Sequence, residues 1–441
     1  MKESQYNFSV NHNNRIIFYN AITGDLLSFT ENEFENISIL LKNLSLLEVK
    51  YPSLLQYFIR TGFVIKDGVN ELDIVKFRNN QNVFLDKEYR LVINPTLECN
   101  FNCWYCYERH CKGRMGQKTM NKIKKHVNLL IDNKQIDSLH LDWFGGEPLL
   151  YFNEVIFTLA SYFQKISKKK NISYRNTITT NGYLITEEMI NQFKKTNFNF
   201  FQITLDGNKE QHNKIRRHYG KDSYDVIINN VILLCKEMKD VEIVLRLNYS
   251  EKTMENDFTK DLEIIPLEYR KKITVDFQRI WQTYDSKKDR NQWKIDFSTK
   301  VRKMGFYYKG LGHLFPYKGI SCYVDKLNHL EINFDGQVYK CTARGYDKKY
   351  VVAELLPSGE LLWKENELSK RFSNPTFQNE MCLKCKCLPI CIGPCSQKIF
   401  EVKTNHNLEN ICTLKLSEYK IEDYIIDCYE SLMDYRKTLI K

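Results

Sequence analysis

Between about residue 86 and residue 280, short apolar runs alternate with longer amphipathic stretches. The runs are rich in β-branched and aromatic residues, which favours strands, and the stretches between them have helical spacing. This alternation predicts a parallel sheet with right-handed crossovers. The expected strands are Tyr89–Ile93, Ser138–Trp143, Tyr174–Thr180, Phe200–Leu205, Glu242–Asn248 and Ile273–Gln278, and the clearest helices are Lys118–Asp132, Glu154–Lys168, Glu187–Lys195 and Asp225–Lys236.

Six strand–helix units predict the α/β class. They favour a partial (β/α)6 barrel, similar to a TIM barrel but not closed by eight strands. In such folds the reactive groups lie on the loops at the carboxyl ends of the strands. We therefore expect functional residues directly after each predicted strand.

The first 85 residues form a separate pattern. Two strands joined by a Thr23–Gly24 turn precede two helices and a last strand, and Thr30 with Glu33 forms a capping box for the first helix. This β-β-α-α-β order is compatible with a small winged-helix domain. The expected elements are Arg15–Tyr19, Leu26–Phe29, Glu31–Leu44, Leu54–Thr61 and Gly62–Ile65.

After about residue 310 the pattern becomes irregular and rich in cysteine, and Leu416–Leu439 has the apolar spacing of a final helix. Metal clusters would replace a large apolar core in such a segment. The sequence thus predicts three domains, at residues 1–85, 86–310 and 311–441.

Composition narrows the class of protein. Hydrophobic residues make up 43% of the chain, enough for real cores, and the formal net charge of +11 is spread along it, as in Lys168–Lys170. Such spreading is typical of a solvated surface, and no nucleic-acid motif accompanies it. No signal peptide and no apolar run of about 20 residues is visible. We expect a cytoplasmic protein that binds neither nucleic acid nor membrane.

Fourteen cysteines in a reducing compartment favour metal ligation over disulfides. Cys99, Cys103 and Cys106 follow the first barrel strand in the form C-x3-C-x2-C. Three thiolates can hold three irons of a [4Fe–4S] cluster and leave the fourth iron open to a small molecule. A structural zinc site would need a fourth ligand, for which only His110 or Cys111 is near.

This motif resembles the cluster motif of the radical S-adenosylmethionine (SAM) superfamily, and the resemblance covers roughly residues 86–280. Three further segments follow in family order, each at the end of a predicted strand. They are Phe144–Pro148, which has the family's glycine-glycine-glutamate-proline sequence, Thr179–Gly182 and Thr204–Gly207. Taken alone, the first two read as ordinary turns.

The resemblance implies that the amino and carboxylate groups of SAM chelate the open iron. Reduction then yields a 5′-deoxyadenosyl radical that abstracts a substrate hydrogen, while the protein positions the groups and excludes water. Residues implied to contact the cofactor are Tyr105, Gly145, Gly146, Glu147, Thr180, Asn181, Thr204, Arg216 and Arg246. Arg217 and Asn248 are further candidates for cofactor contact. For each of these arginines, a surface salt bridge is the alternative role.

The later cysteines follow a C-x13-G-x4-C pattern and then C-x2-C-x5-C-x3-C, before a last cysteine. This resembles the seven-cysteine SPASM domain over about residues 310–415, which implies two auxiliary [4Fe–4S] clusters and three clusters in all. A zinc ribbon is the alternative. Implied ligands are Cys382, Cys385, Cys391 and Cys412 for the distal cluster, and Cys322, Cys341 and Cys395 for the nearer one, whose fourth ligand stays open.

Four cysteines fall outside these two ligand sets and the first motif. Cys387 lies inside the C-x2-C-x5-C-x3-C segment but departs from the family pattern, and we expect it to be a bystander. Cys111, Cys235 and Cys428 are expected to pack as small buried hydrophobes.

The substrate class remains open between two hypotheses. The first is maturation of a ribosomally made precursor peptide through a thioether or carbon–carbon crosslink, and the second is oxidation of a sulfatase residue to formylglycine. The N-terminal region resembles the leader-recognition domain of peptide maturases, which binds a leader peptide by strand addition, although a structural cap is the alternative. The family also implies an electron donor such as flavodoxin or ferredoxin.

The sequence assigns no general base. Asp276, Gln278 and Arg279 lie on the sixth strand and are open possibilities, because alternation alone does not say which of them face the cavity. An electron-carrying iron–sulfur protein or a zinc-binding interaction protein would not explain Gly145-Gly146-Glu147 beside a three-cysteine site.

Overall fold

The computed structural model describes residues 1–283, 291–308, 319, 321–373, 375–402, 411–416 and 420–439. The chain divides into two compact units. The first, here called the barrel unit, comprises residues 86–309 and 328–368. The second, the knuckle unit, comprises residues 1–85, 310–327 and 369–441. The predicted boundary near residue 310 lies outside the described residues, and the three-domain division stays a prediction.

The barrel unit contains an eleven-stranded sheet in the order β14-β13-β12-β9-β8-β7-β6-β15-β16-β17-β18. All pairs from β14 through to β15 are parallel, and β15 to β18 pair antiparallel. The main strands are β6 (Glu88–Ile93), β7 (Ser138–Trp143), β8 (Ser173–Thr180), β9 (Phe198–Asp206), β12 (Glu242–Tyr249) and β13 (Ile273–Arg279). The shorter ones are β14 (Tyr307–Tyr308), β15 (His329–Ile332), β16 (Gln337–Tyr339), β17 (Ala353–Leu355) and β18 (Leu361–Trp363).

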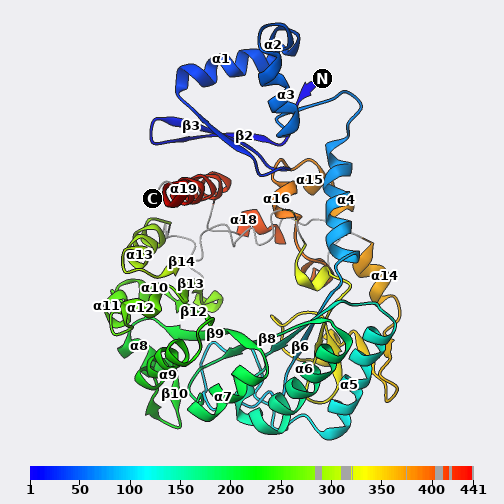
Figure 1. Cartoon of the computed structure of the whole chain (residues 1–441), viewed down its shortest axis with the longest axis vertical. Coiled ribbons are helices and arrows are strands. Elements are labelled where there is room, and N and C mark those ends of the chain that lie inside the picture. The colour runs from blue at the N-terminus through cyan, green and yellow to red at the C-terminus, as the bar shows by residue number, and fades with distance from the viewer. Residues whose placement is uncertain are drawn as a thin grey trace. The chain divides into compact units, whose positions relative to one another are not determined.

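The predicted α/β class and the six parallel strands are confirmed. Each expected strand differs from the observed one by two residues or fewer at either end. The sheet is covered by helices, and Figure 1 shows α5, α6 and α7 along its outer face. The helices are α5 (Gln117–Asp132), α6 (Thr158–Lys170), α7 (Glu187–Lys195), α8 (Lys209–Ile215), α9 (Tyr224–Glu237), α10 (Glu251–Met254), α11 (Thr259–Leu262), α12 (Leu267–Arg270) and α13 (Asn291–Lys303).

Two expectations for this unit were wrong. Residues 152–157 form a π-helical turn before α6, so the expected helix Glu154–Lys168 begins later, at Thr158. Residues 329–363, which we expected to be irregular, contain strands β15 to β18. Strand β15 pairs with β6, the strand that precedes the first cysteine motif. Separately, a two-stranded hairpin of β10 (Arg217–His218) and β11 (Lys221–Asp222) follows α8.

The knuckle unit brings together two distant parts of the chain. Its N-terminal part contains β1 (Lys2–Glu3), β2 (Asn7–His12), β3 (Arg15–Asn20), β4 (Leu26–Phe29), α1 (Glu31–Lys42), α2 (Leu44–Lys50), α3 (Pro52–Arg60), β5 (Val64–Ile65) and α4 (Glu71–Phe84). Its C-terminal part contains α15 (Glu380–Leu383), α16 (Leu388–Cys391), α17 (Ser396–Glu401), α18 (Thr413–Leu416) and α19 (Ile421–Leu439), and α14 (Glu367–Phe372) leads into it.

The N-terminal elements largely follow the prediction. Thr30 and Glu33 form the expected capping box of α1. The helix ends at Lys42, earlier than expected, because the Asn43 side chain accepts a hydrogen bond from the Leu46 N–H and so caps α2. Strands β2, β3 and β4 form an antiparallel sheet in which β4 is an edge. Strand β2 and helix α4 were not predicted.

A shared apolar core joins the two parts of the knuckle unit. Tyr6, Ile17 and Tyr19 from the N-terminal sheet pack in one cluster with Ile390 and Tyr424 from α16 and α19. The final helix begins at Ile421, later than expected, and residues 417–419 lie outside the described part of the chain. Among the described helices, none has the length and apolarity needed to cross a bilayer.

Candidate functional site

The first cysteine motif lies where the sequence placed it, in the loop of residues 94–116 after β6, which we call the cluster loop. Cys99 and Cys103 are half-buried and Cys106 is exposed. All three line one pocket at the carboxyl ends of the strands, together with residues from the loops after β7, β8 and β9. The structure therefore brings the three thiols to the mouth of the barrel.

The chemistry of this donor set fits an iron–sulfur cluster. Burial raises the pKa of Cys99 to about 12, with a further contribution from the Glu147 charge, and burial also raises the pKa of Cys103. Thiols held neutral in this way release protons when they bind metal. In the described part of the chain, no three Cys, His, Asp or Glu side chains converge on a single-ion site; the thiolates of a [4Fe–4S] cluster bind different irons and need not converge.

The two glycines after β7 make room for the cluster loop. Gly145 has a φ of +104°, and a Cβ there would lie 2.3 Å from the Thr96 carbonyl oxygen. A Cβ on Gly146 would lie 2.2 Å from the Glu98 carbonyl oxygen. The Glu147 N–H also donates to that oxygen, at 2.7 Å. Close backbone packing against the cluster loop therefore requires glycine at both positions.

Glu147 is fully buried and is bound by other protein groups. Its carboxylate accepts hydrogen bonds from the Leu149 N–H at 3.0 Å, the Thr180 hydroxyl at 2.8 Å and the Asn181 N–H at 2.8 Å. Burial raises its pKa to about 7 against these hydrogen bonds. Glu147 thus ties the turn after β7 to the turn after β8, and its predicted contact with the cofactor ammonium remains untested.

Asn181 connects the turn after β8 to the cluster loop. Its side-chain amide donates to the Asn100 side-chain oxygen at 2.7 Å, directly beside Cys99. Its own side-chain oxygen accepts from the Tyr183 N–H at 2.9 Å. Thr180 and Asn181 both line the pocket, as do Gly145 and Gly146. The signature segments are therefore mutually hydrogen-bonded around one cavity.

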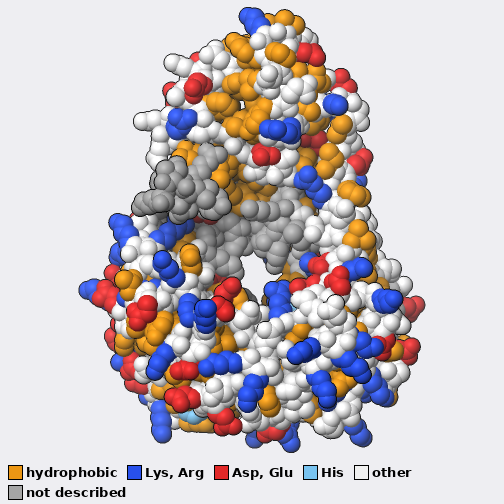
Figure 2. All heavy atoms as spheres, in the orientation of Figure 1, with side chains coloured by type: hydrophobic (Ala, Val, Ile, Leu, Met, Phe, Trp, Pro, Cys, Tyr) orange, Lys and Arg blue, Asp and Glu red, His pale blue; other side chains and the backbone are white. Residues whose placement is uncertain are grey.

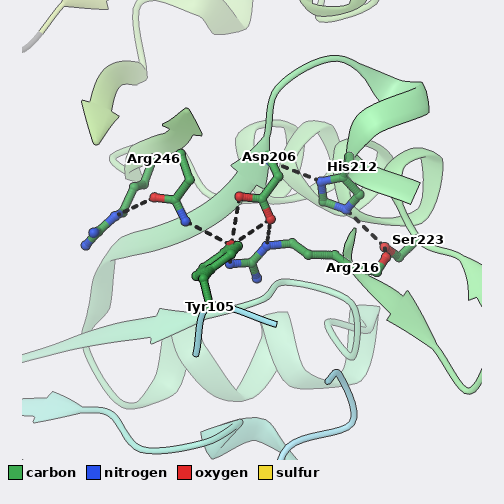
Figure 3. Close-up of polar contacts among 7 residues, drawn as sticks. Tyr105, Asp206, His212, Arg216, Ser223 and Arg246 are labelled. Atoms are coloured by element: carbon green, nitrogen blue, oxygen red, sulfur yellow. Dashed lines mark hydrogen bonds and ion pairs between the residues drawn. The ribbon is translucent and has the colours of Figure 1, made fainter. Parts of the chain in front are cut away.

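The opposite wall of the pocket comes from β9 and β12. Thr204 and Arg246 are paired in register on these neighbouring strands, and both line the pocket. The Arg246 Nε donates to the Asn248 side-chain oxygen at 3.1 Å, as Figure 3 shows. Arg216 also lines the pocket, whereas Arg217 is exposed on the β10–β11 hairpin near Asp222. The structure thus separates the two arginines that sequence left open.

Tyr105, from the cluster loop, lies at the centre of the polar contacts in Figure 3. Its hydroxyl contacts Asp206 and Arg216, and the two charged side chains form an ion pair. Asp206 stood in the recognised segment after the fourth strand but was not predicted to be a site residue. Glu108 was missed altogether, although it lines the pocket.

The sixth strand contributes one pocket residue. Arg279 lines the cavity, while the Gln278 amide donates to both carboxylate oxygens of Asp276 at 3.0 and 3.1 Å. No general base is assigned by this arrangement.

The knuckle unit gathers the four cysteines expected for a distal cluster. Burial raises the pKa of Cys382 to about 11, and the charges of Cys385 and Cys412 contribute. Burial raises the pKa of Cys391 to about 12, and Cys412, Cys385 and Cys382 add to it. The four thiols are therefore close enough to interact electrostatically. Cys387 lies beside them, because its side chain lowers the pKa of Cys385 to about 6.

Cys322 and Cys395 form a second pair in this unit. The Cys395 side chain raises the pKa of Cys322, and the Ser396 N–H donates to the Asp325 carboxylate at 3.1 Å. Cys341, the third expected ligand of the nearer cluster, lies after β16 in the barrel unit.

The remaining cysteines are placed differently from one another. Cys235 is buried and Cys428 packs half-buried against the knuckle core, as expected. Cys111 is exposed, so the expectation of a buried packing role is wrong. The cluster loop carries it on the outside rather than into the core.

Known proteins with similar sequences contain the same type of domain. Residues 93–260 match the family model of the Radical SAM superfamily. The radical SAM cyclopropyl synthase TigE of Paramaledivibacter caminithermalis is 28% identical over 40% of this chain and 39% of its own length. A cysteine-type anaerobic sulfatase-maturating enzyme of Clostridium perfringens (strain 13 / Type A) is 27% identical over 72% of this chain and 91% of its own length. The chain spans about two-fifths of the first curated relatives that it matches.

Solved structures share the fold. The structure of anSMEcpe with bound AdoMet is 19% identical, with a TM-score of 0.57, and covers 79% of this chain and 99% of its own. Streptococcus suis SuiB bound to precursor peptide SuiA is 16% identical, with a TM-score of 0.51, and covers 93% of this chain and 99% of its own.

Proposed function

We propose that this chain, whose residues 93–260 match the Radical SAM superfamily model, is a radical SAM enzyme that crosslinks a ribosomally made precursor peptide. The crosslink is a thioether or a carbon–carbon bond. The family implies a [4Fe–4S] cluster and SAM as cofactors. The residues of the barrel pocket support the proposed binding place of these cofactors. The N-terminal sheet supports the proposed presentation of the peptide.

One observation carries the choice of substrate class. The SuiB fold covers 93% of this chain, whereas anSMEcpe, which was solved with the Cp18Cys peptide, covers 80%. The SuiB structure contains a precursor peptide. The larger coverage by a neighbour solved with a precursor peptide, together with the proposed leader-recognition role of residues 1–85, supports a precursor peptide over a sulfatase.

The barrel pocket supports the chemical part of the proposal. A cluster and SAM held by Cys99, Cys103 and Cys106 would supply one-electron cleavage and abstraction of a substrate hydrogen atom. Glu147 and Asn181 hold the two turns around the cluster loop, and Thr204 and Arg246 form the wall that would orient the cofactor carboxylate. Cys99 and Cys103 pack against the apolar core of the barrel unit, which limits the access of water to these two thiols.

The SPASM-like cysteine pattern supports two auxiliary clusters, and hence three clusters in all. Cys382, Cys385, Cys391 and Cys412 would bind the distal one. Cys322, Cys395 and Cys341 would bind the nearer one, with an open fourth position. Such a position suits electron acceptance or a substrate thiolate, while flavodoxin or ferredoxin would serve as the external donor.

The N-terminal sheet supports recognition of a leader peptide. Strand β4 pairs only with β3 among the described strands, so one edge can accept an added strand. Ile39, Val49 and Tyr51 are exposed in the same segment, and Figure 2 shows hydrophobic side chains gathered on the N-terminal elements. Binding of the leader there would raise the effective concentration of the rest of the peptide.

Formylglycine formation is the second candidate. It is favoured by the coverage of a sulfatase-maturating relative, which aligns over 91% of its own length. Under this alternative the N-terminal part is a structural cap, and the pocket residues keep the same roles.

The deciding experiment is anaerobic coexpression with short peptides encoded beside the gene, followed by mass spectrometry. We expect a loss of two hydrogens from one peptide, with fragmentation placing the new bond. The Cys99→Ala variant should leave that peptide unmodified. Turnover of a sulfatase-derived peptide, with every neighbouring peptide unchanged, would replace crosslinking by formylglycine formation.

A further inference from the structure

We propose that Tyr105, Asp206 and Arg216 form a latch that holds the cluster loop in the conformation that binds the cluster. Asp206 and Arg216 are then positioning residues, and Tyr105 is the part of the loop that they hold. The inference rests on the proposed function only in taking the cluster loop as the site of the radical cluster.

The latch begins at the Tyr105 hydroxyl. Tyr105 lies between the expected ligands Cys103 and Cys106, and its hydroxyl is 2.7 Å from both carboxylate oxygens of Asp206. The same oxygen accepts from Arg216 Nη2 at 2.8 Å and from the Asn248 amide at 3.0 Å. One donated and two accepted hydrogen bonds use the full capacity of a phenol.

The partners come from three separate elements. Asp206 ends β9, Arg216 follows α8, and Asn248 belongs to β12. The neighbour Trp104 is 59% exposed, so Tyr105 is the inward anchor of the segment between Cys103 and Cys106. A loop tied at this point cannot separate its two flanking cysteines from the strand ends without breaking the contacts.

A closed ring of hydrogen bonds fixes the two charged partners. The Asp206 N–H donates to His212 Nδ1 at 3.3 Å, which leaves His212 Nε2 to donate to the Ser223 hydroxyl at 3.0 Å. The Ser223 hydroxyl in turn donates to the Arg216 carbonyl oxygen at 2.6 Å. The ion pair between the Arg216 and Asp206 side chains closes the ring, as Figure 3 shows.

Burial makes the ring stiff. Asp206 is 1% exposed, and His212 and Ser223 are fully buried. The carboxylate and guanidinium neutralise each other in a place where an unpaired charge would be costly. Arg216 uses Nε for Asp206 and Nη2 for Tyr105. Arg216 therefore mainly binds other side chains of the pocket wall, while Arg246 presents its guanidinium group to the pocket.

The test measures how tightly the cluster is held. Tyr105→Phe removes the hydroxyl and keeps the ring. Tyr162→Phe is the matched control, because the Tyr162 hydroxyl accepts a hydrogen bond from Asn128 on helix α5 and not from the cluster loop. Anaerobically purified protein is exposed to an iron chelator. The readout is the EPR signal of the reduced cluster that changes on addition of SAM, which reports the cluster with the open iron.

We expect Tyr105→Phe to lose this signal about tenfold faster than the native protein, within the range found for groups that orient metal ligands. Ser223→Ala, which opens the ring without touching Tyr105, should give a smaller acceleration, and Tyr162→Phe none. Equal loss in Tyr105→Phe and the native protein would overturn the latch. Asp206→Asn should have the largest effect, but Tyr105→Phe decides if that variant does not fold.

The signal also separates this inference from the proposed function. A native protein that holds a SAM-responsive cluster but modifies no precursor peptide would overturn crosslinking and leave the latch standing. A Tyr105→Phe variant with native cluster retention and native crosslinking would overturn the latch alone.

Discussion

The barrel unit and the knuckle unit both gather cysteines, but they position them by different means. In the barrel, the cluster loop is held by strands, glycine contacts and a hydrogen-bonded ring above a large apolar core. In the knuckle, Cys382 and Cys391 lie on α15 and α16, helices of four residues each, and Cys382 is itself part of a smaller core.

This difference implies that the two units depend on metal binding for their stability to different extents. A preformed site loses little structure when its metal is absent, whereas a site built from short helices gains much of its stability from metal binding. We therefore expect the barrel to fold without a cluster and to need one only for chemistry. The knuckle should gain a large part of its stability from its cluster.

Removing one knuckle cysteine should produce the largest effect on stability. Cys391→Ala is expected to lower the midpoint of thermal unfolding of the knuckle unit by about 10 °C, the shift that a loss of ~3 kcal/mol gives in a unit of this size. Cys99→Ala should shift the barrel transition by less than about 2 °C. Calorimetry with limited proteolysis of residues 375–402 separates the units, and equal shifts in both variants would break the comparison.

Crowding the cluster loop should give an intermediate effect in the barrel. A Cβ at Gly146 would meet the Glu98 and Leu97 carbonyl oxygens at 2.2 and 2.4 Å. Gly146→Ala is therefore expected to weaken iron retention at Cys99 about tenfold, or ~1.4 kcal/mol, with little change in barrel unfolding. Gly116→Ala is the control, because nothing lies within 4 Å of its Cβ position. Native iron retention in Gly146→Ala would contradict the prediction and would show that the cluster loop moves to make room for the added methyl group.

The smallest effect is expected at Cys387. Its side chain lies beside that of Cys385 and lowers the pKa of Cys385, and serine keeps a polar group at this place. Cys387→Ser should leave the iron content unchanged. The free energy of unfolding should change by less than about 0.5 kcal/mol. Loss of iron comparable to that of Cys391→Ala would make Cys387 a ligand and sharpen the account of the knuckle.

The sequence predicted the barrel strands well because their signal is local. Each of the six strands is a short apolar run next to a helix, and the motif at its end is contiguous in the chain. Strands β15 to β18 carry three or four residues each, which is too few for a period to emerge. Their place beside β6 depends on long-range pairing that no window of sequence contains.

The sequence placed the cysteine motif and the signature segments at the ends of the strands, but it did not predict their contacts with one another. Glu147 was expected to face the cofactor, yet its described hydrogen bonds go to Leu149, Thr180 and Asn181. Tyr105 and Asp206 are 101 residues apart, and only folding shows that they meet. Likewise, the division into three consecutive domains gave no hint that β3 and α19 share a core.

That shared core has a consequence for the order of events during synthesis. The Ser28 hydroxyl lies 3.5 Å from the Tyr429 hydroxyl, across 401 residues of chain. The N-terminal sheet leaves the ribosome first but cannot complete its packing until α19 has been made. The barrel, whose contacts are mostly between neighbouring segments, emerges whole in the interval. Translation thus delays the unit proposed to capture the leader until the unit proposed to modify the peptide has had time to fold.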